Sequence, residues 1–190
     1  MLLRAAPLCV AAAWVAPGSA HAGASLCRAD EAVAFSCSLV RRTASLCLQR
    51  DGEQTTALSF RLGERRGQRP RIERQYTATG PNGQHFSANV SPAMPGAVVR
   101  QVWFDQAGSR TLLTECLGSA CRQSAGLAVL RAGRVVSQWR CQRTADDAAW
   151  FSGQLVKFGA DAASSQSTTP LLRIEEIDNP VERLYPPPRR

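Results

Sequence analysis

The stretch AVAFSCSLVRRTASLCL, residues 32–48, decides how this chain folds. Two short apolar runs, each with one cysteine, flank the polar pair Arg41 and Arg42, which can stay in water at the tip of a turn. Alternating apolar and polar residues are typical of half-buried β-strands, so the stretch predicts a β-hairpin. Its core face is expected to consist of Val33, Phe35 and Cys37 in the first strand and of Leu46 and Leu48 in the second. Cys47 then points away from the core. A direct bridge to Cys37 is disfavoured, because a cross-strand pair must lie on one face.

Alternating segments of the same kind follow along most of the chain, separated by turns rich in Gly, Pro and Asn. Residues 55–62 alternate cleanly and predict one buried and one wet face, as in an antiparallel sheet. Residues 63–70 are expected to form a loop, and residues 80–83, Gly-Pro-Asn-Gly, a hairpin turn. Further strands are expected at residues 71–77, 84–90, 98–105, 111–116, 126–130 and 135–141. The pattern predicts an all-β protein, a single antiparallel sandwich or barrel of about eight to ten strands.

The N-terminal residues have the layout of a secretory signal peptide. Arg4 gives a positive start, residues 5–15 are apolar, and small residues before a break predict cleavage after Ala22. The apolar run is shorter than the roughly 20 residues that a membrane-spanning helix needs. The alternative is a lipoprotein signal with Cys27 as the lipidated residue, but the bulky Leu26 precedes that cysteine. We expect a periplasmic or secreted protein with no transmembrane segment.

Cleavage of residues 1–22 would leave an even number of cysteines, because Cys9 leaves with the signal peptide. An even number in an exported chain predicts disulfides, since the exterior is oxidising. Many pairings are open, but Cys116 and Cys121 lie close enough in sequence to close a small ring. The face assignments favour an inward Cys141 as the partner of the inward Cys37. The expected pairs are therefore Cys116–Cys121, Cys37–Cys141 and, by what remains, Cys27–Cys47.

Metal binding and catalysis have little support in the sequence. No C-x-x-C pair exists and His85 is the only histidine after the predicted signal peptide, so zinc-ligand spacing is missing. A nucleophile needs an activating base, and only His85, which Asp105 or Asp147 could orient, would supply one. Nucleophile-elbow and phosphate-loop motifs are missing too. We expect no catalytic residue, no cofactor and no metal, with a hydrolase that uses His85 as an alternative.

The charge of the chain is strongly positive. The formal net charge is +8, and almost every basic residue is an arginine. A local cluster of arginines in residues 61–74 suggests a surface for an anionic partner, such as an envelope component or an acidic protein. Its members are Arg61, Arg65, Arg66, Arg69, Arg71 and Arg74. A solvated loop between two strands is the plainer interpretation. Nucleic acid is not an expected partner, because no aromatic residue is interleaved with these arginines before Tyr76.

The domain is expected to span residues 23–159. Residues 160–190 turn to small polar residues and proline, which predicts a mostly disordered tail. Within it, residues 171–174, Leu-Leu-Arg-Ile, could form a transient strand or a short partner-binding motif.

The motifs Phe35-Ser36-Cys37, Ser45-Leu46-Cys47, Arg61-Leu62-Gly63 and Trp139-Arg140-Cys141 form an FSC…SLC…RxG…C pattern. Over residues 27–141 this pattern resembles an uncharacterised family of exported proteobacterial proteins. That resemblance implies a small periplasmic β-domain and supplies no enzyme activity for this chain. The basic segment 65–69, the Cys116/Cys121 pair and the long tail depart from the family pattern. In size and layout the chain is also similar to the periplasmic lysozyme inhibitors, although their Ser-Gly-x-x-Tyr loop is not found in this sequence.

From the sequence we therefore expect an exported, non-enzymatic binding or envelope-associated protein. The alternative is an inhibitor of a secreted hydrolase such as lysozyme.

Overall fold

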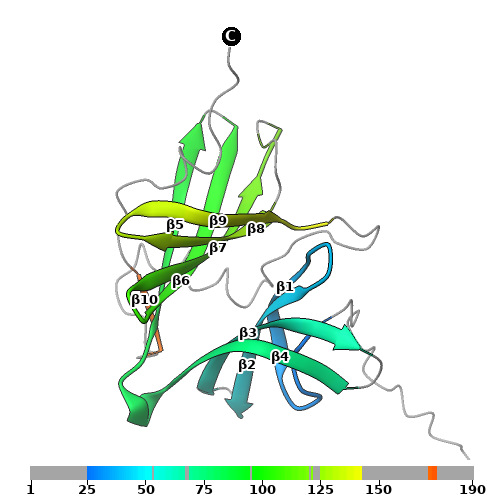
Figure 1. Cartoon of the computed structure of the whole chain (residues 1–190). Helices are drawn as coiled ribbons and strands as arrows, with labels where there is room; N and C mark the ends of the chain where they lie inside the picture. The colour runs from blue at the N-terminus through cyan, green and yellow to red at the C-terminus, as the bar shows by residue number, and fades with distance from the viewer. Residues whose placement is uncertain are drawn as a thin grey trace, which may run out of the picture.

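The computed structural model describes residues 25–52, 54–66, 69–94, 96–119, 121, 125–142 and 171–174. These residues form two β-sheets packed together (Figure 1). The predicted signal peptide and most of the predicted tail lie outside the described residues. Within the described part of the chain, no helix has the length and apolar character that crossing a membrane requires.

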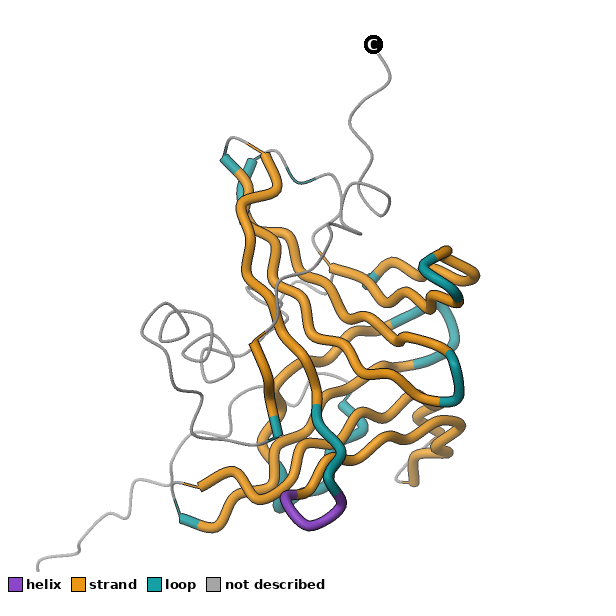
Figure 2. The backbone as a smooth tube through the Cα atoms, turned by 90° about the vertical axis from the view of Figure 1, so that its left-hand side faces the viewer, coloured by secondary structure: helices purple, strands orange, loops and turns teal. Residues whose placement is uncertain are grey.

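The first sheet is a four-stranded meander in chain order. Its strands are β1 (Ala32–Ser38), β2 (Thr43–Asp51), β3 (Gln54–Arg66) and β4 (Arg69–Thr79). The 3-10 turn η1 (Gly80–Asn82) leads to the second sheet, and is the only helical turn drawn in Figure 2. In the spatial order β10-β5-β6-β7-β8-β9, the second sheet contains β5 (Phe86–Met94), β6 (Ala97–Gln106), β7 (Ser109–Leu117), β8 (Ala125–Arg131), β9 (Arg134–Arg140) and β10 (Leu172–Ile174). All paired strands are antiparallel except β10 and β5, which are parallel. The predicted all-β sandwich is confirmed.

Aromatic rings from both sheets meet in the core between them. The ring of Tyr76 on β4 stacks on that of Phe104 on β6, with 4.3 Å between centroids. Phe60 on β3 and Phe86 on β5 approach the same Phe104 ring at 5.1 and 5.4 Å. Four consecutive strands therefore contribute one ring each to a single buried cluster. Aromatic pairs in tilted, offset geometries add to the stabilisation that area burial gives.

The opening hairpin has the expected form, with one difference. Leu46 and Leu48 are buried in the core and Arg41 and Arg42 are exposed at the turn. Val33 was expected on the core face, but it is 38% exposed. The register of β1 against β2 shifts between Val33 and Phe35, and this irregularity turns Val33 away from the core.

Three disulfides are present among the described residues, and they join the three expected pairs. Cys37 on β1 is bonded to Cys141, just after β9, and the amide of Gln142 donates to the Ser38 carbonyl oxygen at 2.7 Å. The free edges of the two sheets are thus tied together across a sequence separation of 104 residues. The other two bonds are Cys27–Cys47 and Cys116–Cys121.

The expected loop at residues 63–70 is wrong. β3 runs to Arg66 and β4 starts at Arg69, so the two strands form one long hairpin. Gly63, the first residue of the expected loop, lies in a bulge between β3 and β4. A Cβ there would lie 2.2 Å from the Arg71 carbonyl oxygen, so the close approach of the strands requires glycine. Pro70 is tolerated because β4 is an edge strand, where a missing amide donor can face solvent.

Residues 160–190 are expected to be mostly disordered, and the segment at 171–174, for which a strand is the stated alternative, does form one. Leu172–Ile174 is strand β10, and Leu171 and Leu172 are each 3% exposed in the core cluster. Burial of a leucine side chain contributes about 1.5–3 kcal/mol. Fixing the backbone costs about 1–2 kcal/mol per residue, so ordering four residues costs about 4–8 kcal/mol and offsets the whole gain of about 3–6 kcal/mol from the two leucines. The backbone hydrogen bonds to β5 then supply the remaining stabilisation, at about 0.5–1.5 kcal/mol each. The net stabilisation from docking this short segment is therefore small.

Candidate functional site

The β3–β4 hairpin extends beyond the rest of its sheet. The last β3 residue that pairs with β2 is Gly63, opposite Thr43, whereas pairing with β4 continues to Arg66 opposite Arg69. Beyond Gly63 the hairpin is therefore a two-stranded extension. Its described strand residues include Arg65, Arg66, Arg69 and Arg71, against the single acid Glu64.

Arg74 of β4 continues this basic region beyond the extension, and the turn before β2 adds two more arginines. Arg71 and Arg74 are exposed. Arg41 and Arg42 are exposed in the turn beside the base of the extension, where Arg42 Nε forms a 3.0 Å ion pair with Glu73 Oε2 of β4. The backbone pairing brings seven arginines to this hairpin and the turn beside it, and we call the set the basic hairpin surface: Arg41, Arg42, Arg65, Arg66, Arg69, Arg71 and Arg74. Sequence reasoning placed Arg41 and Arg42 in water but did not bring them to this surface, because only the pairing of Thr43 with Gly63 does so.

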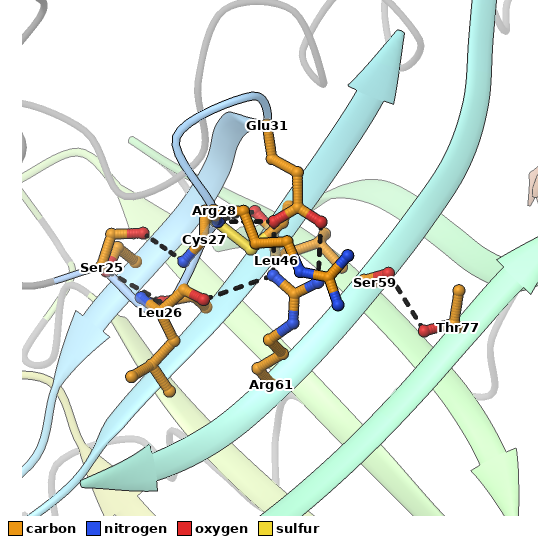
Figure 3. The surroundings of a disulfide bond; sticks show 12 residues. Ser25, Leu26, Cys27, Arg28, Glu31, Leu46, Ser59, Arg61 and Thr77 are labelled. Carbon is orange, nitrogen blue, oxygen red and sulfur yellow. Dashed lines mark hydrogen bonds and ion pairs between the residues drawn. A yellow bond between two sulfur atoms is a disulfide. The ribbon is translucent and has the colours of Figure 1, made fainter. Parts of the chain in front are cut away.

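Arg61 does not belong to the basic hairpin surface, and this prediction is wrong. Its side chain is 5% exposed and is covered by the N-terminal segment that precedes β1 (Figure 3). Both terminal nitrogens bind the Glu31 carboxylate, with 2.7 Å from Nη2 to Oε1, and Nη1 also donates to the Leu26 carbonyl oxygen at 3.3 Å. The predicted wet face of β3 is thus a covered polar face.

The N-terminal segment, residues 25–31, is held on this face by bonds of several kinds. The Cys27–Cys47 disulfide fixes it to β2, and the Leu26 amide donates to Ser45 Oγ at 3.0 Å. Small hydroxyl side chains on this face of the sheet pair across neighbouring strands. Ser59 Oγ on β3 and Thr77 Oγ1 on β4, for example, lie 3.0 Å apart (Figure 3). A face of small polar residues leaves room for a covering backbone and satisfies its polar groups, so the arrangement is structural.

Charge and hydrogen bonding keep Glu31 ionised. Burial alone would raise the pKa of Glu31, but the hydrogen bonds from Arg61 and from the Arg28 amide, together with both positive charges, lower it below 4.5. Glu31 also lies within 4.8 Å of the Cys27 and Cys47 sulfurs, a grouping that could hold a metal ion. The two sulfurs are bonded to each other and the carboxylate is paired with Arg61, so these atoms do not form a free ligand set.

His85, the alternative catalytic residue, lies in the short segment before β5. Its carbonyl oxygen accepts a 3.0 Å hydrogen bond from the Tyr76 hydroxyl. The pKa of Tyr76 is raised above its usual value. Burial, the largest cause, and the charge of Asp105 both raise it, and the hydrogen bond to His85 lowers it by less. The Asp105 carboxylate pairs with Arg110 through two contacts, at 3.0 and 2.9 Å. Among the described residues there is no hydrogen bond between His85 and Asp105. Asp147, the other residue that could orient His85, lies outside the described residues, so the hydrolase alternative stays a prediction.

A shallow pocket of about 400 Å³ lies at the turns of the β6–β7 and β8–β9 hairpins. The ion pair of Asp105 and Arg110 lies on its wall, and Arg110 also sits over the Trp103 ring at 5.5 Å. Both charges are therefore already matched within the protein. The pocket offers no unmatched charge that would select a ligand.

Comparison with known proteins finds no matching family model, curated protein or solved structure.

Proposed function

We propose that this protein is an exported, non-enzymatic binding module whose basic hairpin surface engages an anionic component of the cell envelope. The observation that carries the proposal is the two-stranded extension beyond Gly63, which concentrates arginines on a projecting element. Arginine presents a planar fork of donors that matches phosphate and carboxylate groups. Arginines on a hairpin that extends beyond its sheet can contact an extended charged surface more readily than arginines on a flat sheet face can.

Export is part of the same proposal. Three disulfides support an oxidising compartment, and the signal-like residues 1–22 supply the route. An anionic partner outside the cytoplasm would be a phosphate-bearing lipid or lipopolysaccharide, or an acidic protein. The phosphate-bearing surface is favoured because the arginines are spread over two strands and a neighbouring turn. Arginines that are spread out in this way match a surface with many separate phosphate charges better than they match a single carboxylate.

The test is sedimentation binding to vesicles of phosphatidylglycerol, with phosphatidylcholine vesicles as the neutral reference. We expect binding to the anionic vesicles only, and a steep loss of binding as salt rises, because salt screens exposed charges. The triple variant Arg65→Ser, Arg66→Ser, Arg69→Ser should weaken binding at least about tenfold, as expected when several phosphate contacts are lost.

A matched control separates local charge from net charge. The triple variant Arg50→Ser, Arg134→Ser, Arg140→Ser removes the same charge from exposed positions on β2 and β9. It should keep most of the affinity. Equal losses in the two triple variants would mean that net charge alone drives adsorption, and would refute a site on the hairpin. Binding to a polyglutamate peptide in place of vesicles would point to an acidic protein partner.

A further inference from the structure

Strand β10 occupies only one end of the β5 edge. Leu172, Arg173 and Ile174 pair in parallel with Phe86, Ser87 and Ala88, whereas β5 continues to Met94. The Phe86 amide adds one more backbone bond, a 2.8 Å donation to the Leu171 carbonyl oxygen. Figure 1 shows β10 as a short orange segment far along the chain from its green neighbours. The edge thus accepts a short strand that comes from a distant part of the sequence.

Two side chains define what this edge accepts. Leu171 and Leu172 belong to the same buried cluster as Phe86 and Tyr76, at the side where the two sheets are joined through η1. The occupant is therefore an extended segment with two adjacent large aliphatic residues. Backbone pairing gives such a complex its affinity, and the aliphatic pair gives it selectivity.

The docked segment is suited to exchange between copies of the chain. Its net docking stabilisation is small, as the comparison of leucine burial with chain ordering indicated. Residues 143–170 connect it to the end of β9, and a chain of that length can reach on the order of 90 Å when fully extended. A second copy would offer the identical segment and make the identical contacts. Docking of the chain's own segment and docking of a second copy's segment then differ in free energy only through the local concentration that the connection within one chain provides.

We propose that the Phe86–Ala88 edge of β5 is a strand-acceptor site whose partner is the 171–174 segment of a second copy. In an isolated chain the protein's own segment fills the site. At high local concentration, as on a crowded surface, segments exchange and link the copies. This inference is independent of the basic hairpin surface.

The first test uses a fluorescent peptide of residues 169–176 and the full-length variant Leu171→Asp, Leu172→Asp, whose own segment no longer fits. The variant should bind this peptide saturably, and at least tenfold more tightly than the wild-type protein does, because the wild-type segment competes. The same peptide carrying both aspartates should not bind. Equal or undetectable binding by variant and wild type would overturn the proposal.

A second measurement needs no variant. Sedimentation of the wild-type protein at concentrations up to about 1 mM, on the order of the effective concentration that a connection within one chain can provide, should show a reversible dimer that excess peptide dissolves. Hydrogen exchange of the Phe86 amide should be at least tenfold faster than that of Leu113 at the centre of the same sheet. A monomer at every concentration, or a dimer that the peptide leaves intact, would overturn the assignment to a second copy.

Discussion

The buried ion pair of Glu31 and Arg61 is the residue-scale feature with the clearest energetic consequence. Glu31→Gln keeps the shape but leaves the Arg61 guanidinium buried without a countercharge. Removing one partner of a buried pair typically costs about 3–5 kcal/mol, so we expect a loss of that size in the free energy of unfolding measured with denaturant. Asp105→Asn at the exposed pair with Arg110 is the control, and it should cost less than about 1 kcal/mol. Equal losses in the two variants would contradict the account of Arg61.

The same pair predicts a pH dependence. The pKa of Glu31 is lower in the folded protein than its ordinary value of 4.5, so its stabilising contribution is complete above that value. This contribution is lost as the pH falls through the lowered pKa, where the folded protein must also take up the proton. Thermal melting temperatures recorded from neutral to acidic pH should therefore fall more steeply below pH 4.5 in the wild type than in Glu31→Gln. Parallel curves would show that Glu31 does not titrate as described.

At the scale of single elements, Gly63 sets the course of the basic hairpin. Gly63→Ala would place its Cβ 2.2 Å from the Arg71 carbonyl oxygen, so the two strands must separate at the bulge. Overpacking of this kind typically costs about 1–3 kcal/mol, and we expect a loss of that size together with weaker binding to anionic vesicles. Gly80→Ala in η1 is the control, since a Cβ there meets nothing within 4 Å. A Gly63→Ala protein as stable as the Gly80→Ala protein would argue against the bulge.

Local alternation predicted some elements well and others badly, for physical reasons. It placed Cys37 and Cys47 on opposite faces because those faces depend only on the period of a strand. It failed at Arg61, because the segment that covers this residue comes from Glu31, far away in the sequence. Gly63 and Pro70 suggested a loop because a bulge and an edge strand tolerate the same residues as a turn. Strand β10 is too short to carry a clear signal in the sequence, and Leu171 and Leu172 pack into a core that local patterns cannot reveal.

For the whole molecule, the Cys37–Cys141 bond should be the most stabilising disulfide. It closes a loop of 104 residues, against 5 for Cys116–Cys121. Loop-closure entropy predicts losses of about 5 and about 2 kcal/mol when each pair is replaced by serine. Urea unfolding of the two double variants would measure these losses. The reverse order would mean that native-state strain or packing, and not chain entropy, governs the contribution of these bonds.

The central claim is that the surface that binds an anionic partner lies on the β3–β4 hairpin, where this hairpin extends beyond the rest of its sheet. Hydrogen exchange with and without phosphatidylglycerol vesicles tests it most directly, because it locates the contact on the folded protein. We predict slower exchange in peptides that cover residues 64–74 and the turn at residues 39–42, with no change across the β8–β9 turn. Protection centred on the β8–β9 turn and the neighbouring Asp105–Arg110 pocket, with the hairpin unchanged, would contradict the claim.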